Sequence, residues 1–467
     1  MVTVYNHNKV KGFKTKFGKE KGTAFGGIVL LEKLSKSLGL WRKLEKEIPH
    51  RRGHFDWMSV IKSSVVGLLT GSRGTYATQE IREDEGLLEL TGLSKAPEEA
   101  TFWRCLDQLG SQSFLHIFQI ILCGWLVVII RRVGINRILR KGFLPVFGDG
   151  SILEGSERRE GTKYRKGKGY GLLWTNIFVG PFLACQGLNG KGEGEGTLLK
   201  KMIPLVVSKV LKPLRLLKKA LVLMDSLHGN GPMMDKLESL KLFYIIGARG
   251  LKEAQDKMRD LAEGFWINTG SNLSLGISES GVCMTWVKCL GWKKSRTVIG
   301  YRYKKKGEFI WNYSGVLTNL SQKQVEHLMK DGKSFPETVW ELYGMKGGLE
   351  NYYKNLLEDL GLHHPPCQEL QKNAGFYALG SMAYNLGLSV EMIGSRGMKR
   401  GETKRKDGKA RKRPTPRTMR MWRLIRRFFA LPAKISTHAR KVTVEFLKMS
   451  ETIRNEFEKF WENILRC

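Results

Sequence analysis

The sequence predicts a mixed α/β protein, and three observations carry this prediction. Residues 1–142 have apolar side chains at helical spacing. Short strand-like runs then alternate with helical segments up to residue 246, which is the order of a mixed sheet flanked by helices. From Glu337 the helical pattern returns and continues to the end. We therefore expect a helical N-terminal domain, a mixed sheet interrupted by a β-rich insertion, and a basic helical C-terminal region.

Four helices are expected in the N-terminal region. Three of them are predicted over residues 30–48, 57–69 and 100–109, the last beginning after the breaker Pro97. The fourth spans 17 strongly apolar residues, Phe114 to Ile130, and is shorter than the ~20 residues that cross a bilayer. We expect this segment to be a buried core helix, and no membrane to be involved.

The predicted sheet begins with a short apolar run, Leu144 to Asp149, that ends in a carboxylate. Two further strand-like runs are separated by Gly180-Pro181, and a helical segment leads to a second buried run that ends at Asp225. The predicted order is strand, hairpin partner, strand, helix, strand, helix, strand. Both acids thus lie at the carboxyl end of a buried strand, where ligands gather in such sheets.

The remaining sequence contains a segment with strand-like patterns and a strongly basic segment. Short alternating runs at 285–287, 297–303 and 309–311 predict a β-rich insertion. Between Arg396 and Arg427 there are fifteen Lys and Arg and only two acids. The expected domains are 1–142 (helical), 143–246 (first part of the core), 247–336 (insertion), 337–395 (second part of the core) and 396–467 (basic linker and C-terminal helices).

The net charge points to a polyanionic partner. Lys and Arg number 79 against 44 Asp and Glu, so 79 − 44 gives a formal charge of +35. A hydrophobic fraction of 42% is ample for a buried core and excludes wholesale disorder. Nucleic acid is the expected partner, ahead of an anionic membrane surface. Seven scattered cysteines predict free thiols in a reducing compartment, and no secretory signal is expected.

Three acids are candidate ligands of a divalent metal. Asp149 and Asp225 end neighbouring strands, and Glu350 shares one helix face with Tyr343, Lys346 and Lys354. Converging carboxylates suit Mg²⁺, which prefers hard oxygen ligands. Taken singly, each acid also has a structural explanation: a turn residue for Asp149, a helix N-cap for Asp225, and a solvated helix charge for Glu350.

These residues resemble motifs of the DDE transposases of bacterial insertion sequences, in the group with a β-rich insertion before the last glutamate. The third motif of that group, Tyr-x-x-Arg-x-x-x-Glu-x-x-x-x-x-x-Lys, is matched in spacing by Tyr343, Lys346 and Glu350, with Lys in the Arg position. The final Lys position holds Leu357, and Lys354 lies one turn earlier. Further similar segments are 149–151, 359–366, 382–386 and 438–441.

The resemblance implies an RNase H-like catalytic core in which Asp149, Asp225 and Glu350 form the catalytic, metal-binding triad. It implies Mg²⁺, with Mn²⁺ as a substitute, and phosphate contacts from Tyr343, Lys346 and Lys354. The implied activity is phosphodiester hydrolysis at transposon ends followed by strand transfer into target DNA. The implied partners are duplex DNA carrying terminal inverted repeats, target DNA, and a second copy of the chain on paired DNA ends.

Two basic segments are further candidate DNA contacts. The first provides Lys163, Arg165, Lys166 and Lys168, and the second provides Arg411, Lys412 and Arg413. No Walker A loop or Rossmann fingerprint is present, so no nucleotide cofactor is expected. His363-His364 has no carboxylate or Cys partner at metal-ligand spacing in the sequence and is assigned no zinc.

Two alternatives remain open at this point. One is a catalytically inactive, DNA-binding transposase relic, and the other is a basic RNA-binding or membrane-surface protein. For an active transposase of this kind, the expected location is the bacterial cytoplasm, in association with the nucleoid.

Overall fold

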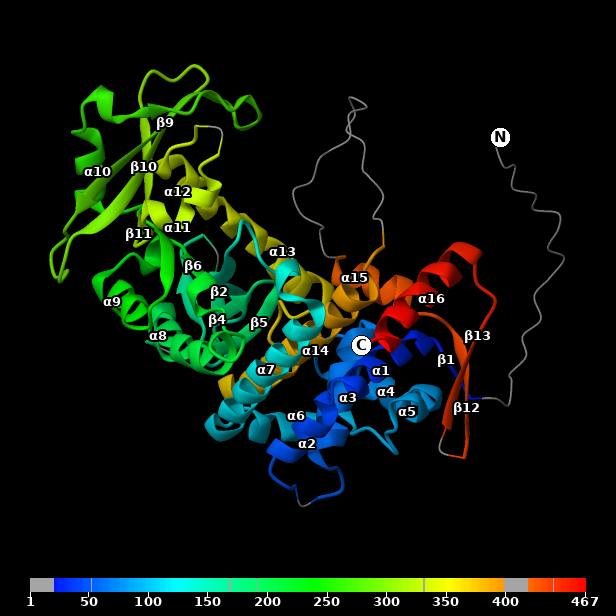
Figure 1. Ribbon diagram of the computed structural model, residues 1–467. Coiled ribbons are helices and arrows are strands. Elements are labelled where there is room, and N and C mark those ends of the chain that lie inside the picture. The colour runs from blue at the N-terminus through cyan, green and yellow to red at the C-terminus, as the bar shows by residue number, and fades with distance from the viewer. Residues whose placement is uncertain are drawn as a thin grey trace, which may run out of the picture.

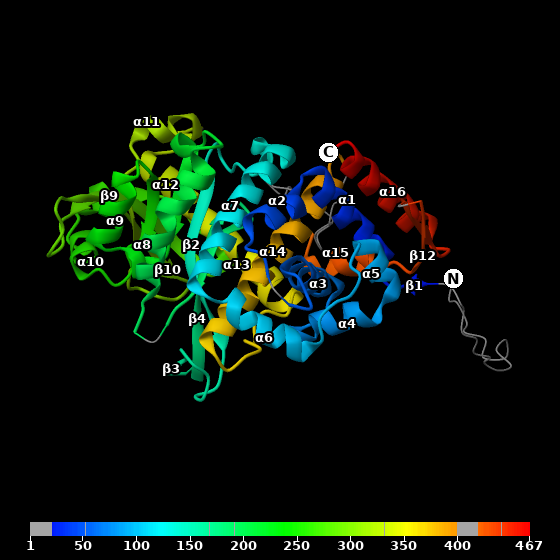
Figure 2. The same cartoon turned by 90° about the horizontal axis from the view of Figure 1, so that it is seen from below.

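The computed structural model describes residues 21–51, 53–167, 169–190, 192–330, 332–398, 419–439 and 441–467. A large sheet with its covering helices forms one end of the molecule, and a mainly helical body forms the other (Figure 1). Figure 2 shows the same division from below. The coarse prediction of a mixed α/β fold is therefore confirmed.

The N-terminal part is mainly helical from residue 29 onward, as predicted, but the helix expected over residues 30–48 is divided in two at Gly39, which has φ +63°. Local signals set the helix ends: the Asp56 carboxylate accepts a hydrogen bond from the Ser59 N–H, and Gly71 ends the same helix at φ +99°. The helices are α1 (Val29–Ser37), α2 (Leu40–Glu47), α3 (Trp57–Thr70), α4 (Ala77–Glu83), α5 (Glu85–Thr91), α6 (Glu99–Leu109) and α7 (Gln112–Val133).

Helix α7 is longer than the sequence predicted. It has 22 residues rather than 17, so among the described helices it is the one long and apolar enough to cross a membrane. The predicted length was wrong because the helix continues through Arg131 and Arg132 to Val133. Its large side chains Phe118 and Trp125 are buried, and the Gln119 amide donates to the Gln186 carbonyl of the sheet. These contacts are those of a core helix.

The central sheet has the predicted order of elements. In chain order they are β2 (Leu144–Glu154), β3 (Lys163–Arg165), β4 (Gly169–Val179), β5 (Phe182–Leu188), α8 (Glu195–Val206), β6 (Ala220–Met224), α9 (Gly231–Ser239) and β7 (Phe243–Gly247). Strands β2, β4 and β5 are antiparallel neighbours, whereas β6 runs parallel to β2 and β7 runs parallel to β6. One prediction was wrong: β2 does not end at Asp149 but continues to Glu154 through its pairing with β4.

The predicted insertion extends the same sheet. It contains α10 (Lys252–Arg259), β8 (Ile267–Asn268), β9 (Ile277–Val287), β10 (Arg296–Lys305), β11 (Asn312–Thr318) and α11 (Gln322–Val325). Strand β11 pairs antiparallel with β7, so the described strands of this region and the core form one ten-stranded sheet. The strand predicted at 309–311 was wrong, because Phe309 and Ile310 are exposed and β11 begins only at Asn312.

A continuous helical segment follows the insertion. It consists of α12 (Phe335–Tyr343), a 3-10 turn (Gly344–Gly348), α13 (Leu349–Lys354) and a π-helical turn (Asn355–Asp359). Gly347 and Gly348, which lack helix propensity, coincide with the 3-10 turn. The α-helix that carries Glu350 begins at Leu349, so the single helix expected from Tyr343 to Lys354 is interrupted by this turn.

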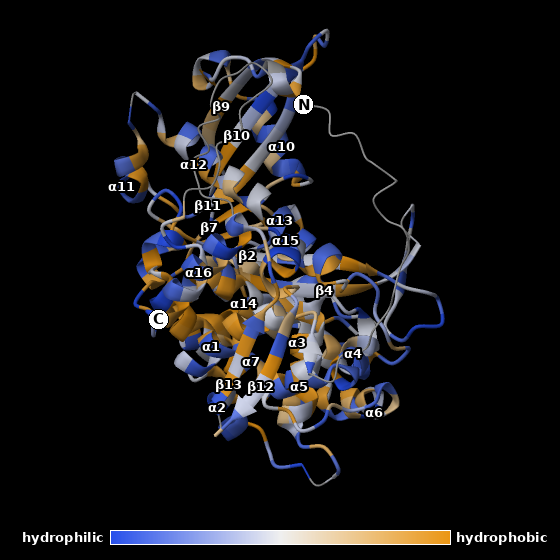
Figure 3. Ribbon diagram, turned by 90° about the vertical axis from the view of Figure 1, so that its right-hand side faces the viewer, coloured by the Kyte–Doolittle hydropathy of each residue, from blue (hydrophilic) through white to orange (hydrophobic). Residues whose placement is uncertain are grey.

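Helix α14 (Leu370–Gly394) joins the two ends of the molecule. Nearly all of its residues are buried, and it packs against α3, α6, α7, β5 and the C-terminal helix. Figure 3 shows it as a hydrophobic element in the middle of the molecule. Close packing on α6 requires a glycine, because a Cβ at Gly375 would lie 2.8 Å from the Leu106 carbonyl oxygen.

The C-terminal region is not helical throughout, contrary to the prediction. After α15 (Met421–Leu424) the chain forms a hairpin of β12 (Ala433–His438) and β13 (Lys441–Phe446), and it ends in α16 (Glu451–Leu465). Strand β12 also pairs with the two-residue β1 (Gly22–Thr23), which gives the hairpin a third strand. Alternation in Lys441–Phe446 is a strand signal that the helical prediction overlooked.

Candidate functional site

Asp149 and Asp225 lie at equivalent positions on neighbouring parallel strands. The ladder between β2 and β6 ends at the pair Phe147–Leu223, and each acid lies two residues beyond it. The Asp225 carboxylate accepts a hydrogen bond from the Leu227 N–H, so it also caps the following turn. The expectation that the sheet would bring these two acids together agrees with this register.

Two further residues join the acids. The His228 side chain is 2% exposed, and its Nε2 lies 2.8 Å from Glu195 Oε1 and 3.7 Å from Asp225 Oδ1. Glu195, the first residue of α8, also lies near β2, because a Cβ at Gly150 would be 2.7 Å from Glu195 Oε2. Sequence reasoning missed Glu195, which follows an ordinary Gly-rich turn and carries no motif. The position of His228, three residues after Asp225, is the one signal in the sequence for its place beside the acids.

The neighbouring carboxylates disfavour the charge of Asp149. Burial, together with the Glu195 and Asp225 carboxylates, raises the pKa of Asp149 to about 6, although Lys346 opposes the rise. The Lys346 Nζ lies 3.5 Å from Asp149 Oδ2. A cluster of hard oxygen donors that repel one another, with a single ammonium beside it, is suited to a divalent cation.

The helical segment of the predicted third motif lies against this cluster. Burial, followed by the charges of Asp225 and Asp149, raises the pKa of Tyr343 to about 12. The Tyr353 hydroxyl, which the sequence did not single out, donates to the Asp149 carbonyl oxygen at 2.9 Å. Lys346 and Tyr353 therefore fix the helical segment onto the strand of the first acid.

Glu350 and Lys354 lie on the same helical segment but are exposed. In the sequence, Glu350 lies four residues after Lys346 and three residues before Tyr353. Among the described residues, the one group of three possible metal ligands within 4.8 Å does not include Glu350, Asp149 or Asp225. Asp149 and Asp225 are thus neighbours in the fold, whereas the Glu350 side chain is exposed on the helical segment that lies against them.

The predicted basic contacts are only partly described. Lys163 lies in β3, and its Nζ donates to the Glu193 carbonyl oxygen at 3.4 Å; Lys166 is exposed in the turn that follows. The Arg165 side chain lies outside the described part of the structure, as do Lys168 and the segment Arg411–Arg413.

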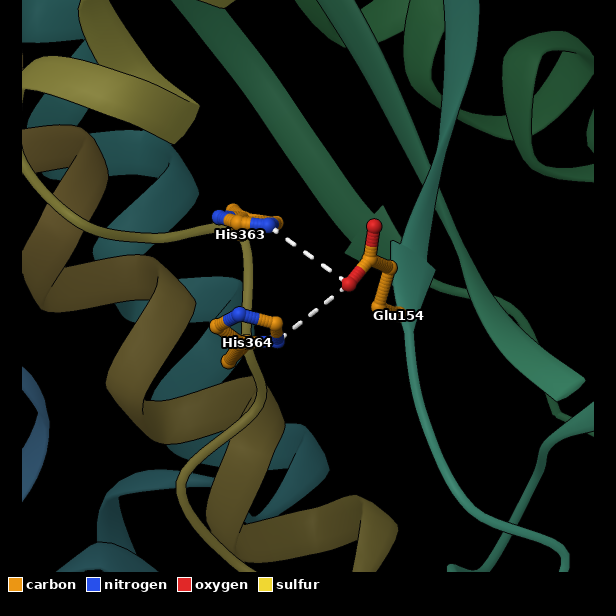
Figure 4. Close-up of side chains that lie close together, drawn as sticks. All are labelled: Glu154, His363 and His364. Carbon is orange, nitrogen blue, oxygen red and sulfur yellow. Dashed lines mark ion pairs between the residues drawn. The ribbon is translucent and has the colours of Figure 1, made fainter.

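Two histidines have a carboxylate neighbour that is distant in the sequence. His363 Nε2 and His364 Nδ1 lie 3.7 and 3.8 Å from one oxygen of Glu154 (Figure 4). This carboxylate could not be predicted, because it is more than 200 positions away in the sequence and only the extension of β2 beyond Asp149 brings it to the histidines.

Comparison with known proteins identifies the domain. Residues 203–386 match the family model described as "Transposase DDE domain", a segment that includes Asp225 and Glu350. Among solved structures, a match titled "Cryo-EM structure of piggyBac transposase synaptic complex with hairpin DNA" is 11% identical, covers 88% of this chain and 82% of the other, and has a TM-score of 0.39. A likeness at that TM-score supports no statement about fold or function. No curated protein matches the chain. Through residues 203–386, the chain is thus similar to the DDE transposases.

Proposed function

We propose that this protein is a metal-dependent DNA transposase, which cuts the phosphodiester bond at transposon ends and joins the freed 3′ ends to target DNA. The observation that carries the proposal is the register of Asp149 and Asp225 beyond the β2–β6 ladder, with Lys346 of the third motif 3.5 Å from the first acid. Neither a DNA-binding relic nor an RNA- or membrane-binding protein needs this arrangement.

The topology supports an RNase H-like core. Three antiparallel strands, β5, β4 and β2, are followed in the sheet by β6 and β7, which run parallel to β2. Acids at the first strand and at the first parallel strand then face the helical segment of the last acid. In this proposal the described strands β8 to β11 are the insertion between the two parts of the core.

Asp149, Asp225 and Glu350 would hold Mg²⁺, for which Mn²⁺ can substitute. The metal supplies charge stabilisation to the attacking and leaving oxygens of a displacement at phosphorus. The chain's own residues position the DNA: Tyr343, Lys346 and Lys354 orient the phosphate, and the segment from Lys163 to Lys168 contacts the backbone. Glu195 and His228 hold the Asp225 side of the cluster in place.

The partners follow from the same proposal. The substrate is duplex DNA with the terminal inverted repeats of an insertion sequence, recognised mainly by the helical N-terminal part, together with target DNA. Two copies of the chain would pair the two ends. The charge of +35 supports DNA binding that weakens steeply with salt. The proposed location is the bacterial cytoplasm, on the nucleoid.

The test uses the purified full chain and a labelled duplex that carries the DNA flanking its own gene. Mg²⁺-dependent cleavage or joining is expected, with loss of activity in Asp225→Asn and Glu350→Gln but retention of DNA binding. Glu326→Gln, at an exposed glutamate outside the acid cluster, is the matched control and is expected to remain active.

Two outcomes would contradict the proposal. Equal, salt-sensitive DNA binding by all variants without cutting would favour a DNA-binding relic. Equal binding to RNA, anionic vesicles and duplex DNA would favour a general polyanion-binding protein.

A further inference from the structure

The second cluster of ionisable side chains joins two distant parts of the chain. Glu154 is the last residue of β2, and His363 and His364 follow the helical segment of the third motif. One nitrogen of each imidazole faces the same Glu154 oxygen, at 3.7 and 3.8 Å (Figure 4). All three possible ligand atoms lie within 4.8 Å of one another.

These distances are close to those of a metal ligand set. With metal–ligand bonds of about 2.0–2.1 Å, two ligands of a tetrahedral zinc ion are about 3.4 Å apart. The two observed N···O distances exceed this separation by a few tenths of an ångström, which side-chain rotation can remove. Two imidazoles and one carboxylate, with the fourth position left to water, are a ligand set that Zn²⁺ accepts.

The backbone under the ligands is held by contacts of its own. The buried residues Leu362 and Pro365 flank the two histidines, and the Tyr377 hydroxyl donates to the Leu362 carbonyl oxygen at 2.7 Å. Nearby, the Arg159 Nε donates to the Cys367 carbonyl oxygen at 2.9 Å. The histidine backbone is therefore fixed before any ion binds, which lowers the entropic cost of ligation.

The cluster is separate from the acids proposed for catalysis. Glu154 lies five positions after Asp149 in β2, which corresponds to about 16 Å along an extended strand. The ligand types also differ: nitrogen donors favour Zn²⁺ and similar transition ions, whereas the all-oxygen set of Asp149 and Asp225 favours Mg²⁺. With 71% of the Glu154 side chain and 66% of the His364 side chain exposed, an ion can enter from solvent.

We propose that Glu154, His363 and His364 bind a transition-metal ion of the Zn²⁺ class. The ion clamps the end of β2 to the loop at 361–369, and so ties the strand of Asp149 to the segment that follows Glu350. This site does not depend on the proposed function, because it requires neither DNA nor an intact acid cluster.

Cobalt is the direct probe of this site. The full chain is stripped with chelator and titrated with Co²⁺ in the presence of excess Mg²⁺, while the visible d–d absorption is recorded. We expect one Co²⁺ ion to bind per chain, with the absorption bands of a four- or five-coordinate ion that has nitrogen ligands. We also expect Zn²⁺ to displace this Co²⁺. Glu154→Gln and His363→Asn should each weaken binding at least about 10-fold, whereas His116→Asn, at an exposed histidine on α7, should bind as the unmodified protein does. Asp149→Asn should also leave the bands unchanged.

Three results would overturn the proposal. Binding that is equally strong in Glu154→Gln, His363→Asn and the unmodified protein would place the ion elsewhere. A sulfur-to-cobalt charge-transfer band would assign the ion to cysteine. The third result is a Co²⁺ spectrum without the bands of nitrogen ligands, in protein that circular dichroism shows to be folded. The three side chains would then form an ion pair only.

Discussion

Neutralising Asp149 should stabilise the folded protein. The pKa of this carboxyl rises from its ordinary value of 3.8 to about 6, through burial and then through Glu195 and Asp225, in spite of Lys346. The folded state therefore holds a proton on Asp149 more tightly than the unfolded state does. The associated stability is fully present below pH 3.8 and is lost as the pH rises through about 6.

The size of the effect follows from these two pKa values. A difference of about two pH units between the folded and unfolded pKa is worth about 3 kcal/mol once the group is ionised in both states. Asp149→Asn keeps the shape and the hydrogen bond from the Gly150 N–H, whose acceptor is Asp149 Oδ1, but it removes the charge. We expect a gain of about 3 kcal/mol in the free energy of unfolding at pH 7.5, which falls to about 1 kcal/mol near pH 4.5.

The assay is urea unfolding of both proteins at the two pH values, in chelator, followed by tryptophan fluorescence. Asp235→Asn is the contrasting control, because Asp235 pairs at 2.5 Å with Arg296, whose side chain is 2% exposed. That variant should lose about 1–3 kcal/mol, since a buried charge loses one of its partners. An Asp149→Asn protein no more stable than the unmodified one at pH 7.5 would refute the reasoning about the acid cluster.

Two further substitutions test the packing and the ion pairs by urea unfolding. Gly67→Ala would place a Cβ 1.9 Å from the Ala77 carbonyl oxygen and should destabilise by about 3 kcal/mol, whereas Gly194→Ala, which meets no atom within 4 Å, should change stability by less than about 0.5 kcal/mol. Arg420→Ala removes the guanidinium from Asp359, whose side chain is 4% exposed, and should cost about 3–5 kcal/mol. A second change, Asp359→Asn, should recover part of that loss; no recovery would argue against a buried unpaired charge.

Much of the core could be predicted because its signals are local. Buried apolar runs that end at Gly-Pro or at a carboxylate marked β2, β4, β5 and β6 correctly, and helix-type periodicity marked the flanking helices. The exact end of β2 could not be predicted, because pairing with β4 decides it and alternation after Asp149 is weak. The same long-range pairing explains why the Glu154 partner of the two histidines was missed.

The site residues that belong to the recognised motif could be predicted from their spacing in the sequence. The spacing of Tyr343, Lys346 and Glu350 marked a helical segment, which the structure interrupts with a 3-10 turn, and the structure brings Lys346 to Asp149. Glu195 and Tyr353 were not predictable, because their roles arise from tertiary contacts with β2 and no periodicity marks them. The C-terminal hairpin was not predicted, because the basic composition of the surrounding segment outweighed the alternation of apolar and polar residues in its strands.

The pairing of β1 with β12 has a consequence for synthesis of the protein. The first strand described and the last hairpin belong to one small sheet, and α16 packs on α1 and on α14. A ribosome must therefore release almost the whole chain before the N-terminal helices find all their neighbours. A nascent chain that has already exposed the N-terminal helices still lacks the strands and the helix that cover them. We expect that shortening the C-terminus by α16 alone unfolds the N-terminal helices, so a premature stop near the end yields no partly functional product.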